Sequence, residues 1–403
     1  MNAPYSGMKV LELANVNGMY CGKILAGLGA EVIKIERPGG DDSRGMGPFF
    51  HGKKGVENSL SFIYFNTGKK DITLDLATAE GKEIFLKLAK DADAVIETFE
   101  PGTLESWGLG YDVLSAANPG IILLSITPFG QTGPHSHWQA STDLIVDAVA
   151  GPMHEVGYVD RPPLHMGYDI QACGLSMYGL FALQAAYHSR KFTGKGAHID
   201  LAQSESITVW RDQYLGTVQI NDEAHLPPRK STDPKSIRYK AVACKDGFGY
   251  LIIGGKWKEL VQWFSDSGMD VSVFDDPKYD IYMVDAIHPW DENILERVTE
   301  LAARYTTAEF MKEGQRRHIP AGVVEDPASM LKNEQLLERG YFVELDHPVI
   351  GKVKYPGAPA ILTQSPYDMS RPAPTLGANN GEIYEKLGLS PREQAELAAR
   401  GVI

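Results

Sequence analysis

Residues 9–36 have the sequence KVLELANVNGMYCGKILAGLGAEVIKIE, which contains three segments of different character. Residues 9–13 and 31–36 are short apolar runs of the kind that form buried strands. Residues 22–29, between them, are typical of a short helix that ends at Gly29. A strand, a helix and a second strand in this order predict a right-handed parallel crossover.

The same alternation continues further along the chain. Residues 78–92 and 102–117 favour helices, while residues 94–97 and 120–126 favour strands. The second of these strands is apolar enough to be buried on both faces, as in a parallel sheet covered by helices. We therefore expect residues 1 to about 200 to form an open parallel α/β domain.

A second, smaller α/β domain is predicted after a linker. Residues 221–236 are polar, rich in proline and without periodicity, which is typical of a linker. Residues 238–255 then favour a hairpin that turns at Asp246 and Gly247, and helical segments follow. One of those helices begins with Thr306 and Glu309 in the spacing of a capping box.

The last helix is predicted from its end signals. Ser390 is placed as the N-cap, Pro391 lies in the first turn and Glu393 completes a capping box. Gly401 is placed to end the helix.

Composition limits the classes of protein to consider. The chain has 403 residues, of which 43% are hydrophobic and 23% are charged, and its formal net charge is −13. This charge argues against a broad nucleic-acid-binding surface. We expect no membrane helix, because no apolar run reaches the ~20 residues required, and no secretory signal in the first residues. The three cysteines are far apart, which predicts reduced thiols and a cytoplasmic location.

Common catalytic and cofactor motifs are missing from the sequence. The first strand–helix turn does not fit the glycine pattern of dinucleotide-binding proteins, so we expect no NAD. There is no phosphate-binding P-loop and no nucleophile elbow of a serine hydrolase. His135 and His137 are the one close histidine pair, and a solvated loop is the simpler interpretation, so we expect no metal.

Two small basic clusters remain as candidates for an anionic ligand. Arg37 and Arg44 lie among glycines just after a predicted strand, where ligands bind in open α/β sheets. Lys69 and Lys70 precede another strand. Either cluster could hold an anionic cofactor, or be a solvated loop.

A single carboxylate, Asp169, precedes the long apolar stretch IQACGLSMYGLFALQAAY. A carboxylate at the start of a helix is ionised at neutral pH and is favoured there by the helix dipole. Asp169 could therefore be a helix cap, a nucleophile or the neighbour of a missing nucleophile.

Several long motifs carry a family resemblance. The stretches GLGAEVIKIERPGGDDSRG, AVIETFEPGTLESWGLGYDVL, TGKG and IPAGVVEDPASMLKNEQLLERGYF resemble the class III CoA-transferases, in order and over nearly the whole chain. That family includes formyl-CoA transferase, carnitine CoA-transferase and α-methylacyl-CoA racemase. The resemblance implies a Rossmann-like large domain of residues 1–220, completed by residues 331–403, and a smaller central α/β domain of residues 237–330. It also implies an interlocked dimer.

The resemblance implies a chemistry as well. The family moves coenzyme A from an acyl-CoA to a carboxylic acid. An aspartate attacks the donor thioester to give a mixed anhydride, the thiolate returns to give an aspartyl-CoA thioester, and the acceptor acid then collects the coenzyme. The catalytic candidate in this chain is Asp169. Carried over position by position, the coenzyme contacts are Val16, Arg37, Lys70, Ile72, Leu74, Thr98, Phe99 and Glu100.

The sequence departs from the family pattern around these positions. In the family, the catalytic aspartate lies at a fixed distance before a T-G-x-G turn, which is Thr193–Gly196 here. Counting that distance back without gaps reaches Ala172. Asp169 is therefore three residues early, or about 4.5 Å along a helix. Thr98 replaces an asparagine near the coenzyme, and Ser106 replaces an arginine. The histidine of the racemases is Thr142 here, which argues against racemisation.

The racemase aspartate that follows that histidine is retained as Asp143, and a helix cap is its simpler interpretation.

These departures leave three hypotheses. The chain is a non-catalytic subunit that interlocks with a related catalytic chain, like the subunits of succinyl-CoA:benzylsuccinate CoA-transferase. Alternatively, it is a self-sufficient homodimeric transferase that uses Asp169. A third hypothesis is an acyl-CoA-binding protein without transfer chemistry.

Overall fold

The computed structural model describes residues 3–138, 143–154, 156–157, 161–165, 167, 170–209, 241–253, 255–283 and 290–403. The chain divides into two compact units. The large unit consists of Met1–Pro152, His165–Ile220 and Glu338–Ile403, and the small unit of Met153–Leu164 and Asn221–Leu337. The linker predicted at residues 221–236 lies outside the described residues.

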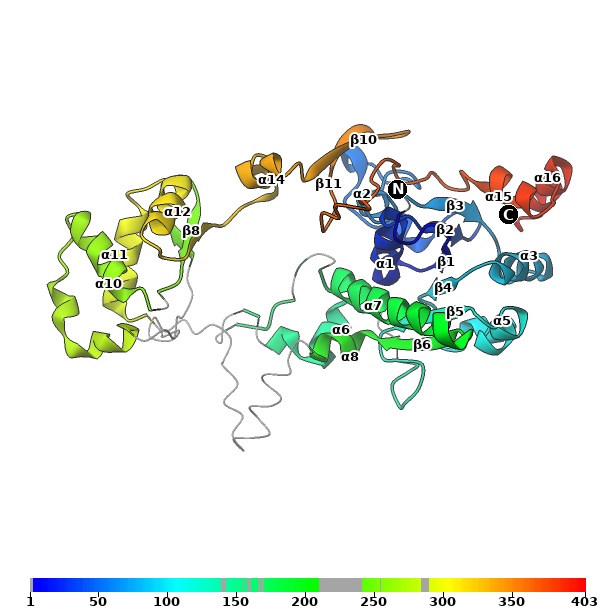
Figure 1. Cartoon of the computed structure of the whole chain (residues 1–403), viewed down its shortest axis with the longest axis horizontal. Coiled ribbons are helices and arrows are strands. Elements are labelled where there is room, and N and C mark those ends of the chain that lie inside the picture. The colour runs from blue at the N-terminus through cyan, green and yellow to red at the C-terminus, as the bar shows by residue number, and fades with distance from the viewer. Residues whose placement is uncertain are drawn as a thin grey trace. The chain divides into compact units, whose positions relative to one another are not determined.

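The large unit is built on a parallel sheet, whose described strands follow the order β3-β2-β1-β4-β5-β6 (Figure 1). The strands are β1 (Lys9–Leu13), β2 (Glu31–Glu36), β3 (Lys70–Thr73), β4 (Ala94–Glu97), β5 (Ile122–Thr127) and β6 (Ala197–Ala202). Leu11 of β1 lies opposite Ile33 of β2 and Val95 of β4, and both pairings are parallel. The predicted crossover is confirmed, and the strand order is that of doubly wound dinucleotide-binding folds.

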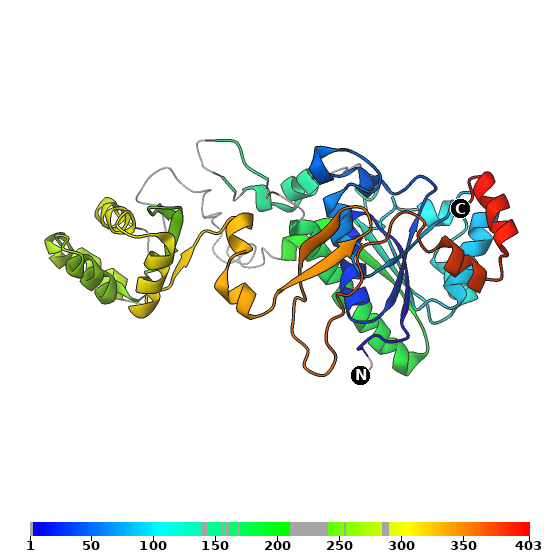
Figure 2. The same ribbon diagram turned by 90° about the horizontal axis from the view of Figure 1, so that it is seen from above.

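Helices cover both faces of this sheet (Figure 2). One face packs against α1 and α7, and the other against α3, α5, α15 and α16. The helices of the large unit are α1 (Val16–Gly27), α2 (Leu60–Phe65), α3 (Ala79–Lys90), α4 (Thr103–Ser106), α5 (Tyr111–Ala117), α6 (Asp143–Ala150), α7 (Ile170–Thr193), α8 (Gln203–Thr208), α15 (Asn380–Lys386) and α16 (Pro391–Ala399). Because both faces are covered, strands such as β4 are buried along their whole length.

Helix α1 begins earlier than the sequence predicts. It starts at Val16 rather than near residue 22, because the Asn15 side chain caps it by accepting a hydrogen bond from the Asn17 N–H. Two glycines within this helix, Gly18 and Gly22, weaken the helix signal. The packing needs them: a Cβ atom at Gly22 would lie 1.7 Å from the Glu12 carboxylate.

The C-terminal segment attaches to the edge of the sheet at β3. The side chains of Asn379 and Asn380 accept hydrogen bonds from the backbone N–H groups of Asp71 and Thr73, at 3.0 and 2.9 Å. The last helix, α16, has the predicted capping box at Ser390. Before it, β10 (Phe342–His347) and β11 (Gly351–Pro356) form an antiparallel hairpin.

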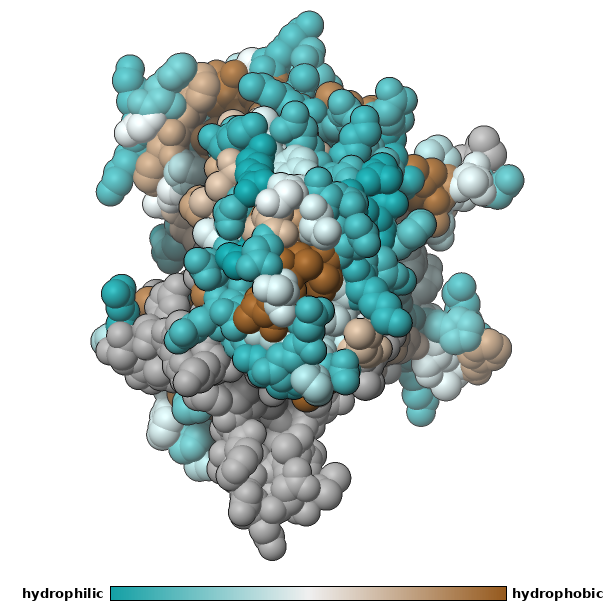
Figure 3. Space-filling view, turned by 90° about the vertical axis from the view of Figure 1, so that its left-hand side faces the viewer, coloured by the Kyte–Doolittle hydropathy of each residue, from teal (hydrophilic) through white to brown (hydrophobic). Residues whose placement is uncertain are grey.

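The small unit has its own sheet and aromatic core. Strands β7 (Ala241–Ala243), β8 (Phe248–Leu251) and β9 (Ala321–Val323) are antiparallel, and they pack with α10 (Trp257–Asp266), α11 (Glu292–Ala302) and α12 (Thr307–Arg316). The predicted hairpin and the capping box of Thr306 and Glu309 are both confirmed. Figure 3 shows a surface of this unit that is largely hydrophilic, with apolar residues in small patches.

Shorter elements complete the description. Between β9 and β10 the chain forms α13 (Pro327–Met330) and α14 (Glu334–Glu338). The described 3-10 segments are η1 (Asp42–Gly45), η2 (Phe50–Gly52), η3 (Pro152–His154), η6 (Ser272–Asp275) and η7 (Pro277–Met283). None of the helices in the described ranges combines the length and the apolar character needed to cross a membrane.

The close approach at Gly22 leads to a stability prediction. Gly22→Ala should lower the free energy of unfolding by roughly 3 kcal/mol, because the added methyl group displaces the fully buried Glu12 carboxylate. The matched control is Gly381→Ala in α15, where a Cβ meets nothing within 4 Å. There alanine should stabilise by about 0.5–1 kcal/mol. Chemical denaturation measures both, and equal effects of the two substitutions would contradict the packing argument.

Candidate functional site at the carboxyl edge of the sheet

The parallel strands place their carboxyl ends along one edge of the large unit. In doubly wound sheets, ligands bind at this edge, where the strand order reverses. Here the order reverses between β1 and β4, which are followed by Asn15 and by Thr98. The backbone N–H of Asn15 donates to Thr98 Oγ1 at 2.9 Å, so the two connections are tied together at the switch point.

The first turn of α1 lies at this switch point. Val16 is its first residue and is partly buried, and Asn17 follows in the same turn. The first N–H groups of a helix point outwards and favour anions. The geometry therefore suits a negatively charged ligand in front of Val16.

Helix α7 is attached to the same place. Ser176 Oγ in α7 donates to the backbone oxygen of Asn17 at 2.9 Å. Gly179, one turn further, lets α7 approach β5 closely, because a Cβ there would lie 3.2 Å from Leu124 Cδ2. The sequence around Asp169 thus leads directly into a helix whose second turn contacts the start of α1. Asp169 itself lies outside the described residues.

The first turn of α7 contains the position found by counting back from Thr193. That residue, Ala172, is completely enclosed. Beside it, the amide of Gln171 donates to Asp147 Oδ1 of α6 at 2.5 Å, and both side chains are buried. Within the described residues, the other oxygen of Asp147 has no hydrogen-bond partner. Sequence reasoning missed Asp147, although an acidic residue inside an apolar helix was a usable signal.

The predicted coenzyme contacts divide into two groups. Val16, Arg37, Thr98, Phe99 and Glu100 all follow the carboxyl ends of strands and lie along the candidate edge. Phe99 is partly buried and packs edge-on against Trp107, with ring centroids 5.2 Å apart, while Glu100 is exposed.

The remaining three predicted contacts lie in β3 or directly after it. Lys70 begins β3 and therefore lies at the opposite, amino edge, where its ammonium pairs with Glu31 at 2.7 Å and Glu382 at 2.6 Å. Ile72 and Leu74 are buried in the hydrophobic core on the α3 side of the sheet. Leu74 directly follows the carboxyl end of β3, and Phe99 packs against the same core cluster as Ile72 and Leu74. Of the three, Lys70 is the one placed at the edge opposite to Val16 and Thr98.

The first basic cluster contains one buried and one exposed arginine. Arg44 is buried, and its guanidinium bonds the carboxylates of Glu36 and Glu57 at 2.8 and 2.9 Å. Burial opposes ionisation of Glu36, but hydrogen bonds from Asp71 and Arg44 outweigh it and lower the pKa of Glu36 to about 2. Arg44 is therefore neither a ligand-binding cation nor part of a solvated loop. Its role is an internal ion pair.

Arg37 remains exposed and lines a shallow cavity of about 260 Å³ after β2. Its guanidinium also pairs with Asp42 and donates to Gly40 O at 3.0 Å. The cavity also contains Lys54, which sequence reasoning missed although it lies in the run Gly-Lys-Lys-Gly. The lining residues are Arg37, Gly39, Gly40, Asp41, Asp42, Arg44, Gly45, Phe49, Lys54, Gly55 and Val56.

Lys69, from the second cluster, is also internal. Its ammonium donates to both oxygens of Glu12 at 2.6 and 2.8 Å, and to Met19 O and Asn66 Oδ1 at 2.8 Å. Burial lowers the pKa of Lys69 to about 8, partly offset by Glu12. This lysine is unavailable to a ligand.

Several other sequence candidates have ordinary surroundings. Asp143 accepts a hydrogen bond from the Gln203 amide at 3.1 Å, and Ser106 donates to Thr103 O at 2.7 Å. His135 packs against the Trp138 ring. In the described ranges, no group of three or more His, Cys, Asp or Glu side chains is arranged to hold a metal ion.

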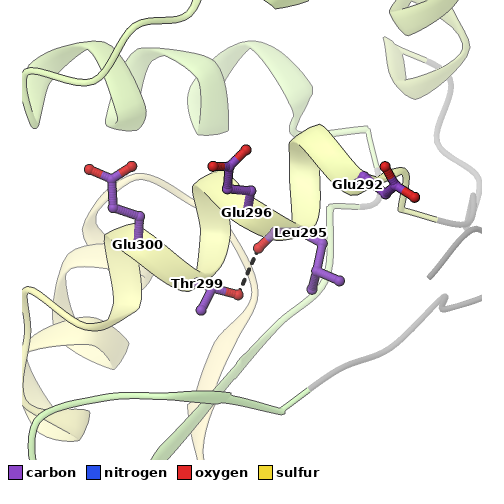
Figure 4. Close-up of a pocket in the computed structure, with 5 residues that line it drawn as sticks. All are labelled: Glu292, Leu295, Glu296, Thr299 and Glu300. Atoms are coloured by element: carbon purple, nitrogen blue, oxygen red, sulfur yellow. Dashed lines mark hydrogen bonds between the residues drawn. The ribbon is translucent and has the colours of Figure 1, made fainter. Parts of the chain in front are cut away.

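The small unit has a shallow depression of about 510 Å³ on α11 (Figure 4). It is lined by Glu292, Glu296 and Glu300 together with Leu295 and Thr299, whose hydroxyl donates to Leu295 O at 2.7 Å. A column of three glutamates repels anions, so this depression does not suit a phosphate-bearing ligand.

Comparison with known proteins gives a consistent result. The profile of CoA-transferase family III matches residues 5–380. The chain is 29% identical to the succinyl-CoA:(R)-benzylsuccinate CoA-transferase subunit BbsE of Thauera aromatica, over 100% of this chain and 99% of that protein. It is 32% identical to succinate–glutarate CoA-transferase of Agrobacterium fabrum, over 95% and 96% of the two chains.

A solved structure is similar over nearly the whole chain. A CAIB/BAIF family protein from Brucella suis superimposes with a TM-score of 0.81 at 27% sequence identity. The match covers 96% of this chain and 100% of that chain.

The two lysines, Lys69 and Lys54, give opposite predictions. Lys69→Met should lower the free energy of unfolding by roughly 3–5 kcal/mol, because it leaves the buried Glu12 carboxylate without its cation. Lys54→Met, at an exposed position, should change stability by less than about 0.5 kcal/mol. Denaturant titration of both variants tests this contrast, and a fully stable Lys69→Met would refute the internal role of Lys69.

Proposed function

Because the chain belongs to CoA-transferase family III, we propose that it serves the transfer of coenzyme A between carboxylic acids at the carboxyl edge of the large unit, as one chain of an interlocked assembly. The observation that carries the proposal is the meeting of α1 and α7 at the switch point, through Ser176 and Asn17. It supports a site in which an acid at the start of α7 meets a ligand held in front of α1.

The coenzyme is proposed to bind along the edge marked by Val16, Arg37, Thr98, Phe99 and Glu100. Its phosphates are complementary to the exposed cations of Arg37 and Lys54, and to the N–H groups that begin α1. These groups supply local positive charge in a chain whose net charge is −13. The two acids are proposed to include succinate, since several relatives are named for succinyl-CoA or succinate.

The proposed chemistry is that of an aspartyl intermediate. A carboxylate attacks the donor thioester carbonyl, the C–S bond breaks and a mixed anhydride forms while the thiolate leaves. The thiolate then attacks the aspartyl carbonyl, which releases the donor acid and leaves an aspartyl-CoA thioester. The acceptor acid repeats the two steps in reverse and leaves as its CoA thioester.

We propose that a related chain supplies this aspartate and that the present chain is the non-catalytic subunit. Ala172, at the position reached by counting back, has no acid and is enclosed. A relative named as a subunit of a benzylsuccinate transferase supports the same arrangement. The alternative, a homodimer that uses Asp169, is favoured by the place of Asp169 directly before α7.

The exposed side of α7 supports an assembly of chains. Ile170, Met177, Phe181 and Phe192 are between 46% and 78% exposed. Their spacings are close to whole helical turns, so they lie in a stripe on one side of α7, opposite its buried side, with the polar Gln184 and His188 between Phe181 and Phe192. An apolar stripe of this length marks a surface that another chain covers.

This stripe gives a direct test of assembly. Phe181→Glu should weaken the oligomer and raise the fraction of monomers, because it places a charge in the apolar contact. The control is Ile361→Glu, which is 65% exposed and lies outside every described helix and strand. Analytical ultracentrifugation measures both, and an unchanged oligomer in Phe181→Glu would contradict the proposed contact.

The catalytic role is tested with the chain alone and with the chain co-expressed with a related subunit. Each preparation is incubated with succinyl-CoA and a panel of acids, and exchange is followed together with intact protein mass. If the chain is non-catalytic, exchange requires the related subunit, and the coenzyme adduct forms on that subunit. Asp169→Ala should then change turnover less than about threefold.

The other outcomes separate the alternatives. The homodimeric enzyme would be established instead if the chain alone catalyses exchange and Asp169→Ala lowers the rate at least 10³-fold. The control, Asp112→Ala at an exposed position of α5, should retain the exchange. Binding of acyl-CoA without exchange in any assembly would establish a binding protein and overturn the transferase proposal.

A further inference from the structure

We propose that Glu97 is a positioning residue whose proton controls the coenzyme loop of residues 98–100, and that Ser125 and His198 connect this proton to solvent. The inference rests on the proposed coenzyme site, because its effect is exerted on Thr98, Phe99 and Glu100.

Glu97 closes the loop that follows β4. It is the last residue of that strand and is 4% exposed. Its Oε2 accepts the backbone N–H of Phe99 at 2.7 Å. Between them, Thr98 accepts the N–H of Asn15 through its hydroxyl. The buried carboxyl therefore fixes the connection after β4, which is hydrogen-bonded to Asn15 at the start of α1.

A line of polar groups leads from Glu97 to the surface across two neighbouring strands. Strand pairing places Ser125 of β5 directly beside Glu97, and the Ser125 hydroxyl acts to lower the pKa of the Glu97 carboxyl. Ser125 Oγ and His198 Nε2, on β6, are 3.0 Å apart. His198 is exposed, and its ring stacks on Tyr111 of α5 at 5.5 Å.

The surroundings of Glu97 favour its neutral form near neutral pH. Burial raises the pKa of Glu97 to about 7, and the negative charges of Glu105 and Asp200 also raise it. Ser125 and the Phe99 N–H lower the pKa, but by less. The charged and titratable groups on the elements around it are Glu105 of α4, Asp200 and His198 of β6, Tyr111 of α5 and, on β1, Glu12, which Lys69 neutralises.

Proton exchange along this line is balanced. The neutral Glu97 carboxyl donates its proton to Ser125 Oγ while the Ser125 hydroxyl proton passes to His198 Nε2. Glu97 becomes a carboxylate, the serine is unchanged and His198 becomes an imidazolium that releases a proton to water. Reprotonation reverses these transfers.

The ionised and neutral forms act differently on the loop. A carboxylate holds the Phe99 N–H more strongly than a neutral acid and also places a negative charge beneath the coenzyme loop. Since the coenzyme carries several phosphate charges, its binding disfavours that carboxylate and is accompanied by proton uptake. Coenzyme affinity should therefore fall as the pH rises through about 7.

The test compares coenzyme A binding by the full-length protein and by Glu97→Gln between pH 6 and 8.5. The glutamine keeps an acceptor for the Phe99 N–H but cannot ionise. The dissociation constant of the unmodified protein should rise about tenfold more over this range than that of the variant, since one pKa unit corresponds to tenfold. Titration of the coenzyme's own phosphates contributes equally to both. Glu83→Gln, an exposed position on α3, should match the unmodified protein.

A second measurement does not depend on the coenzyme. A carboxyl group whose pKa is raised on folding contributes stability below its unfolded pKa, and this stability is lost as the pH rises through the folded value. Between pH 5 and 8 the unmodified protein should therefore lose more stability than Glu97→Gln. Ser125→Ala should move this pH dependence to higher pH, because it removes a hydroxyl that lowers the pKa of Glu97.

Each outcome decides the inference. Equal pH dependence of unfolding in the unmodified protein and Glu97→Gln would show that Glu97 does not titrate in this range, and would overturn it. If Glu97 titrates but the unmodified protein and Glu97→Gln show the same pH profile of coenzyme binding, the proposed effect of Glu97 on the coenzyme loop is wrong. If the protein binds no coenzyme A at any pH, the proposed function is contradicted, and the inference that rests on it is contradicted as well.

Discussion

A lysine without access to solvent, Lys69, holds the large unit together at its centre. Its ammonium joins the Glu12 carboxylate of β1 to the backbone of Met19 in α1 and to the side chain of Asn66 after α2. A buried charge of this kind is tolerated because all its hydrogen-bonding capacity is used. It fixes how α1 lies on the sheet, and α1 in turn places Asn15 at the switch point. The attachment of α7 through Ser176 follows from that placement.

This use of basic residues explains how an acidic chain can carry an anion site. Arg44, Lys69 and Lys70 all pair with carboxylates of the chain, so their charges are neutralised locally. At the carboxyl edge, the proposed anion site contains Lys54, the N–H groups that begin α1, and Arg37, which is exposed although it pairs with Asp42. Such a site binds through local geometry and charge, although the net charge of the protein opposes an anion at long range.

Much of the fold could be predicted from the sequence, because its signals are local. Apolar runs identify β1, β2 and β4, and the capping residues identify α12 and α16. The internal ion pairs could not be predicted in this way: Lys69 and Glu12 are 57 residues apart, and only the folded sheet brings them together. The place of Lys70 was available in the sequence, since a residue that begins a parallel strand lies at the edge opposite to its carboxyl end. Asp147 escaped notice because its burial depends on α7.

The register of α7 restricts how an acid at its start can act. The bond from Ser176 to Asn17 and the contact of Gly179 with Leu124 both fix the helix along its axis. A shift by three residues, about 4.5 Å, would break both and would move the enclosed Ala172 out of its packing. The helix therefore cannot slide to carry Asp169 into the place of Ala172. If this chain performs the chemistry itself, the ligand must meet the carboxylate one turn beyond the usual position, whereas a related chain with its acid in register needs no such adjustment. The fixed register is thus the physical constraint under which the proposed division of roles between two related chains would operate.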